Sequence, residues 1–180
     1  FTSLFFEIWY NKKVGDIMKK LVIPSSIQAI QDELFFADAF LFGIKDLSVH
    51  FEHTYSLEEL KPVIDSLNEQ GKQVFLSCNK NYDRNDLKKL DQTLREIVSL
   101  PVTGVFFYDL AVLELVREKY SNIALVWDQE HMTTNYFSAN FYEKQGVQGI
   151  ALSTNLTLKE ITEMKQNTNM FCIAPIFGYY

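Results

Sequence analysis

The stretch SLEELKPVIDSLNEQGKQVFLSCN, residues 56–79, contains one complete helix-to-strand unit. Ser56 and Glu59 have the spacing of a capping box, and Gly71 can end the helix because glycine readily adopts a left-handed conformation. Between them, apolar residues recur every three to four positions, as in a helix with one buried face. QVFLSC, residues 73–78, is then a continuous apolar run, which is typical of a strand covered on both faces. We therefore predict a helix followed by a buried parallel strand.

Similar units recur along the chain. The predicted strands lie near residues 20–23, 39–44, 73–78, 103–107, 123–126, 148–152 and 170–174. Most are separated by helical patterns, which fall at 56–71, 84–100, 111–120, 133–146 and 157–167. Parallel strands joined by helices need right-handed crossovers, so this order favours an α/β fold of the TIM-barrel-like (βα) type. Such barrels usually take about 250 residues, so we expect about seven parallel strands in an incomplete or truncated barrel.

The barrel pattern begins at Met18, which divides the chain into two parts. We assign residues 18–180 to the barrel domain and residues 1–17 to an N-terminal extension or upstream segment, with a peripheral helix as the alternative. An incomplete barrel would leave a seam of unpaired backbone groups between its first and last strands. We expect this seam to be covered by sequence beyond Tyr180, by FFEIWY (residues 5–10) folded back, or by another subunit.

Composition restricts the possible partners and the compartment. The net charge of -6 and the pI near 5.1 lack the basic footprint of a nucleic-acid-binding domain. We therefore expect no DNA partner, and any contact with RNA would be indirect and would need help from another molecule. Cys78 and Cys172 form no CxxC pair, which fits a reducing, cytoplasmic location, and we expect both to be core residues. The N-terminal aromatic run contains Glu7 and lacks a cleavage site, so we expect neither a signal peptide nor a membrane span.

Several segments, in order, resemble one known family. FADAFLFG (36–43) is similar to the GADAVYLG signature of peptidase family U32, the collagenase-like proteins. FFYDLAVLELVREKY, TTNYFSANFYEKQGVQGIAL and LTLKEITEMKQN then resemble later segments of that family, so the likeness covers about residues 18–180. The resemblance implies a barrel-like fold and a collagenase-like peptidase annotation. In several members it also implies an iron–sulfur cluster that supports prephenate-dependent hydroxylation of the tRNA wobble uridine.

The departures from the family pattern concern the cluster. Cluster-bearing members have a His and a ligand Cys just beyond the seventh strand, where this chain has Ala174 and Gly178. Thr154 and Asn155 stand where the family usually has an Arg-Glu pair. The resemblance therefore implies a degenerate member or a fragment that lacks the cluster cysteines. We expect no metal in this chain, with a cluster possible only in a partner or beyond Tyr180.

Barrel enzymes carry their chemistry at the carboxyl ends of the strands. There the resemblance retains Asn79 and Asp109, while Glu130 and His131 could form an acid–base pair or contribute to a metal site; all four are weak catalytic candidates. The substrate-binding candidates are Asn79, Asp128, Ser153 and Thr154. The carboxylates near residue 130 have a plainer explanation, since acidic residues favour the start of a helix. His50 and His53 are expected to be polar loop residues, because no third ligand is evident.

Two classes of function stay open, and whether the chain is an enzyme is uncertain. We favour a non-catalytic or substrate-binding subunit that acts with a cysteine-rich, cluster-bearing paralogue in tRNA wobble-uridine hydroxylation. The alternative is a collagenase-like peptidase, as the family annotation implies. GxSxG, HExxH and P-loop motifs are all absent from the sequence, so the commonest hydrolase signals do not support it.

Overall fold

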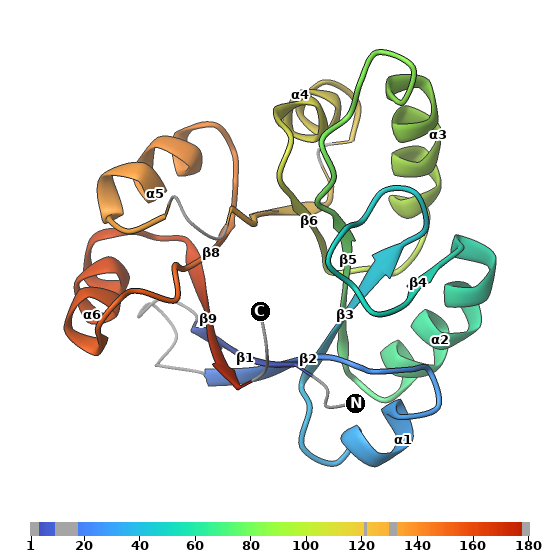
Figure 1. The fold of residues 1–180 in the computed structure, drawn as a ribbon, viewed down its shortest axis with the longest axis horizontal. Coiled ribbons are helices and arrows are strands. Elements are labelled where there is room, and N and C mark those ends of the chain that lie inside the picture. Colours follow the sequence, from blue (N-terminus) through green and yellow to red (C-terminus); the bar gives the residue numbers. More distant parts are fainter. Residues whose placement is uncertain (1–3, 10–17, 121, 130–132, 178–180) are drawn as a thin grey trace.

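A ring of parallel strands forms the centre of the molecule, seen in a computed structural model that describes residues 4–9, 18–120, 122–129 and 133–177 (Figure 1). All seven predicted strands are present and each pairs in parallel with the next. They are β2 (Met18–Ile23), β3 (Ala39–Ile44), β5 (Gln73–Cys78), β6 (Gly104–Phe107), β7 (Ala124–Trp127), β8 (Gly149–Ala151) and β9 (Phe171–Phe177). The predicted α/β barrel of parallel strands is therefore confirmed.

The seam between the first and last of these strands is filled. β1 (Leu4–Trp9) runs antiparallel between β2 and β9 and pairs with both, and the β2–β3 pairing then completes the ring. The expected incompleteness of the barrel is wrong, because β1 supplies the missing backbone partners. Of the three covers considered for the seam, the folded-back segment is the one observed. Residues 4–9 thus share one barrel with residues 18–177, while the origin of residues 1–17 stays a prediction.

The helices surround the ring on its outside (Figure 1). They are α2 (Leu57–Glu69), α3 (Leu87–Ile97), α4 (Leu110–Lys119), α5 (Tyr136–Lys144) and α6 (Leu158–Asn167), together with the short α1 (Ile30–Glu33). The capping boxes at the starts of α2 and α6 are formed as predicted. Gly71 and Gly146 follow α2 and α5 with positive φ angles of 72° and 91°, which glycine adopts without steric cost. The chain therefore leaves both helices at the expected positions.

Alternation along the strands creates two hydrophobic cores. Val74 and Leu76 of β5 face the helices and belong to the large outer core, whereas Phe75 between them belongs to the inner core that fills the barrel. The inner core contains Ile8, Leu21, Ala39, Leu41, Phe75, Phe106, Val126 and Ile173. β1 contributes to it through Ile8, which is 0% exposed. The N-terminal strand is therefore packed inside as well as paired at its edges.

A truncation inside the barrel tests this role of β1. We expect Ile8→Ala to lower the free energy of unfolding by about 2–5 kcal/mol, because it leaves a cavity in the inner core. Ile176→Ala is the matched control, since Ile176 is 51% exposed and its loss should change the stability by less than about 0.5 kcal/mol. Urea unfolding followed by circular dichroism measures both; equal effects would show that β1 is not part of the cooperative fold.

Candidate functional site

The carboxyl ends of the parallel strands form the barrel mouth, which we define as the ends of β3, β5, β6, β7 and β8 with the loops that follow them. Barrel enzymes build their sites at this end. The short strand β4 (Thr54–Tyr55) pairs with Gly43 and Ile44 at the end of β3, beyond the point where β2 stops pairing. The loop of residues 45–53 therefore leaves β3 and returns to the same edge, beside the mouth.

Hydrogen bonds join the loops after β3 and β5. Ser48 Oγ donates to the Ser77 carbonyl at 2.6 Å and accepts from the Ile44 N–H at 2.7 Å. Asn79 Oδ1 accepts from the Val49 N–H at 2.9 Å. Backbone groups of these loops thus bond to side chains, where in a helix or sheet they would bond to other backbone groups. The first half of the 45–53 loop is therefore fixed to the end of β5.

Asp109 connects the next pair of loops. Its Oδ1 accepts from the Ala111 N–H and so caps α4, while its Oδ2 accepts from the Tyr82 N–H, both at 2.9 Å. The Tyr82 hydroxyl donates to the Leu47 carbonyl at 2.9 Å. Burial raises the pKa of Tyr82, which keeps its hydroxyl protonated for this bond. Asn79 and Asp109, two of the weak catalytic candidates, thus anchor backbone at the mouth.

The remaining candidates lie along β7 and β8. Asp128 directly follows β7 and is half-buried, and its N–H donates to the Phe107 carbonyl at 2.9 Å. Ser153 is buried beyond β8; its N–H donates to the Thr133 carbonyl and its Oγ accepts from Asn155. Thr154 is exposed. Glu130 and His131 lie outside the described residues, so their predicted roles stay predictions.

One inward-facing residue at the mouth was missed by the sequence reasoning. Ser77 lies on the same side of β5 as Phe75, so its side chain points toward the barrel axis. Ser77 is 0% exposed, and its Oγ has no hydrogen-bond partner within the part of the chain that the structure describes. The signal that could have found it is the two-residue period, which places a polar group in line with inner-core residues.

A second buried hydroxyl lies beside the end of β8. Thr133 is 1% exposed, and its Oγ1 likewise has no partner in the described ranges, while its carbonyl accepts from Ser153. Buried polar groups are nearly always hydrogen-bonded, and an unpaired one costs about 1–3 kcal/mol. Ser77 and Thr133 are therefore exceptions that need an explanation, and both occur at the barrel mouth.

The two cysteines belong to the outer core, as predicted. Cys78 and Cys172 are both 0% exposed, and burial raises the pKa of each thiol to about 12. Iron–sulfur clusters are held by thiolates, commonly four, and this chain has two cysteines that face the helices. The described residues do not fit such a cluster. In this part of the chain no group of three His, Cys, Asp or Glu side chains could hold a metal ion.

His50 and His53 are exposed loop residues, as expected from the sequence. His53 lies 3.9 Å from Glu52, an exposed pair that contributes little to stability.

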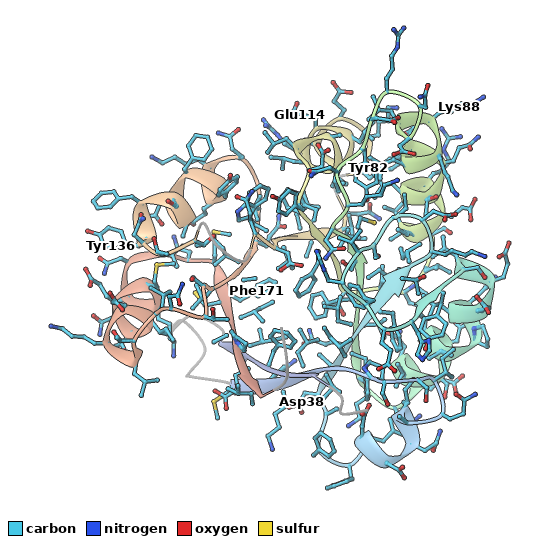
Figure 2. The ribbon with its side chains drawn as sticks, viewed as in Figure 1. Asp38, Tyr82, Lys88, Glu114, Tyr136 and Phe171 are labelled. Atoms are coloured by element: carbon cyan, nitrogen blue, oxygen red, sulfur yellow. The ribbon has the colours of Figure 1, made fainter. Side chains whose placement is uncertain are left out.

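Across the described residues, no helix is both long and apolar enough to cross a membrane. Figure 2 shows that side chains fill the ring that the ribbon leaves open.

The structure is a closed (βα) barrel with buried hydroxyl groups at the carboxyl ends of its strands. In a protein of this class, the loops that follow the strands would carry the function. This chain belongs to peptidase family U32, whose family model matches residues 29–180. The family resemblance seen in the sequence is therefore confirmed. In structure the chain is similar to the U32 peptidase Mk0906, with a TM-score of 0.69 and 15% identity over 84% of this chain and 65% of that one.

Relatives fall under two descriptions. The chain is 25% identical to tRNA hydroxylation protein P2 of Bacillus subtilis, over 79% of this chain and 46% of that protein. It is 23% identical to tRNA hydroxylation protein P of Escherichia coli, over 72% and 29%. It is also 31% identical to the uncharacterized protease MJ0090 of Methanocaldococcus jannaschii, over 73% and 32%. The chain thus spans less than half the length of these curated relatives.

The anchoring role of Asp109 predicts a loss of stability. We expect Asp109→Ala to lower the free energy of unfolding by about 1–3 kcal/mol, because it removes the α4 cap and leaves the Tyr82 N–H without its partner. Asp109→Asn keeps one acceptor oxygen and should lose less. Chemical denaturation of the three proteins checks this order; an unchanged Asp109→Ala stability would leave the residue without a structural role.

The raised cysteine pKa values predict unreactive thiols. At pH 8 a thiol with a pKa near 12 is ionised in roughly one molecule in ten thousand, so iodoacetamide should modify Cys78 and Cys172 only after unfolding. Folding favours the neutral form of each thiol and so contributes to the free energy of unfolding. This contribution is fully present below the thiol pKa of the unfolded chain and is lost as pH rises from about 9 toward 12. Mass spectrometry after native and denaturing alkylation measures the difference. Rapid native labelling of either thiol would contradict the burial.

Proposed function

We propose that this chain is the substrate-binding barrel of a cytoplasmic, prephenate-dependent system that hydroxylates the wobble uridine of tRNA. RNA is held at the barrel mouth. The oxidising chemistry comes from an iron–sulfur cluster whose cysteines belong to a related subunit or to sequence outside these 180 residues. The observation that carries the proposal is the inward-facing, unpartnered Ser77 hydroxyl at the mouth, since a ligand would give this group its missing partner. The names of several relatives support the choice of substrate.

A group of lysines beside the mouth supports contact with RNA. A hydrogen bond from Lys89 and the charges of Lys89, Lys45 and Lys80 lower the pKa of Asp46, so all three lysines lie near that carboxylate. Lys89 Nζ lies 2.6 Å from Asp46, and Lys80 Nζ lies 3.0 Å from Asp86. Two of the three lysine charges are thus paired with carboxylates, and the group adjoins the 45–53 loop in a chain whose net charge is -6. It is a suitable place for a phosphate of RNA.

The peptidase alternative gains less from the site. A serine nucleophile needs a base within hydrogen-bonding distance, and Ser77 Oγ has no such neighbour among the residues that the structure describes. The chain also holds no thiol with a lowered pKa, since burial raises the pKa of both cysteines. The tRNA proposal therefore explains more of the mouth than the peptidase alternative does.

RNA binding by the lysine group can be tested with charge reversals. In the full-length protein, purified anaerobically with its cysteine-rich paralogue, we expect Lys45→Glu and Lys89→Glu to weaken binding of a tRNA anticodon stem-loop. Each should also reduce the slope of log affinity against log salt by about 0.7–0.9, the value for one phosphate contact. Lys144→Glu, at the other end of the barrel, makes the same charge change and is the control. Filter binding at several salt concentrations measures all three.

Two results would contradict the proposal. One is that Lys45→Glu and Lys89→Glu bind RNA no more weakly than Lys144→Glu. The other is that the pure protein cleaves unfolded collagen while Ser77→Ala abolishes the cleavage and RNA binding is absent, which would establish the peptidase alternative. Analysis of hydroxylated uridine in tRNA, with and without the chain, then tests whether the bound RNA is the substrate.

A further inference from the structure

The ring of Phe51 occupies the space that a side chain at Gly43 would need. A Cβ added to Gly43 would lie 2.7 Å from Phe51 Cγ. Gly43 is on the same side of β3 as Leu41, an inner-core residue, and Phe51 packs against that core. Phe51 therefore reaches from the 45–53 loop into the mouth and covers the end of the inner core.

Ser77 lies beside this ring. Gly43 and Ser77 are paired in the β3–β5 register, so they are neighbours on the inner face of the barrel. The ring that fills the space over Gly43 is thus next to the buried Ser77 hydroxyl, which has no partner in the described part of the chain. An aromatic ring offers a hydroxyl no strong acceptor, so Phe51 does not supply the missing partner of Ser77.

The segment that carries Phe51 is only weakly attached. Val49 is bonded to Asn79, and Thr54 pairs with β3, but between these two points residues 50–52 form no hydrogen bond to the rest of the described chain. His50 has a φ of 63°, an uncommon conformation for a residue other than glycine. Displacing Phe51 would therefore break few polar contacts, while it would free Ser77.

We propose that Phe51 is a displaceable plug and that a ligand ring replaces it, with Ser77 binding the polar edge of that ring. The space that Phe51 fills has the size of one six-membered ring, and a hydroxyl can both donate and accept. A pyrimidine base has this size and carries donors and acceptors along its edge, whereas a purine is larger. The inference rests on the proposed function and adds to it the residues that receive the base.

The plug can be tested by titrating the full-length protein with uridine 5′-monophosphate. We expect Phe51→Ala to bind it at least tenfold more tightly than the unchanged protein, because no side chain competes for the space. Ser77→Ala should weaken binding about five- to tenfold in both backgrounds, the effect of one lost hydrogen bond. Phe137→Ala, on the outside of α5 at 72% exposure, is the matched control and should change nothing. Adenosine 5′-monophosphate should gain less than uridine 5′-monophosphate from Phe51→Ala.

A measurement without ligand examines the same contact. Ser77→Ala should raise the midpoint of thermal unfolding by about 2–4 °C, because it removes a buried unpaired hydroxyl. In the Phe51→Ala background the hydroxyl is open to water, so the same substitution should give no rise. A fall of the midpoint in the unchanged background would show that Ser77 is paired and would overturn the proposal.

The outcomes separate the plug from the tRNA function. Equal uridine 5′-monophosphate affinities of Phe51→Ala and Phe137→Ala overturn the plug, whatever the lysine variants do to RNA binding. Tighter uridine 5′-monophosphate binding by Phe51→Ala and weaker binding by Ser77→Ala support the plug. They do so even if the lysine reversals leave RNA binding unchanged, a result that would overturn the tRNA function alone.

Discussion

The closure of the backbone hydrogen-bond ring is the constraint on which the rest of the structure depends. A parallel sheet of seven strands has two edges, and each edge presents unpaired N–H and C=O groups. β1 removes both edges by pairing antiparallel with β2 on one side and β9 on the other. The closed ring has an inside, so alternate residues of every strand can form an inner core. The mouth is the end of that core, and it exists because the ring is complete.

The mouth combines a rigid framework with one weakly held element. Side chains of Ser48, Asn79 and Asp109 bond to the backbone of neighbouring loops, which fixes the ends of β3, β5 and β6 relative to one another. Phe51 stands inside this framework on a segment without such bonds. A site of this kind keeps its polar groups in place while one aromatic ring can leave, which allows a ligand to bind with little rearrangement of the barrel.

The sequence predicts the parallel strands well because strands buried on both faces leave continuous apolar runs between capped helices. It offers β1 only as one of three possible covers for the seam, since an aromatic run containing Glu7 has no helix after it and pairs with residues about 165 positions away. The anchoring roles of Asn79 and Asp109 depend on which loops are neighbours, and a sequence pattern does not give that. The inward direction of Ser77 could have been predicted, because Ser77 lies two residues after Phe75 in the same strand.

The reversed direction of β1 brings two distant parts of the polypeptide to one end of the barrel. Leu4 pairs with Ile23, and Phe5 pairs with Phe177, so β1 begins where β9 ends, at the carboxyl end of the parallel strands. A segment inserted next to Leu4 or Phe177 would therefore be attached near the mouth and could obstruct it. The turn at residues 99–102, which precedes β6 at the opposite end, offers an insertion point that leaves the mouth accessible.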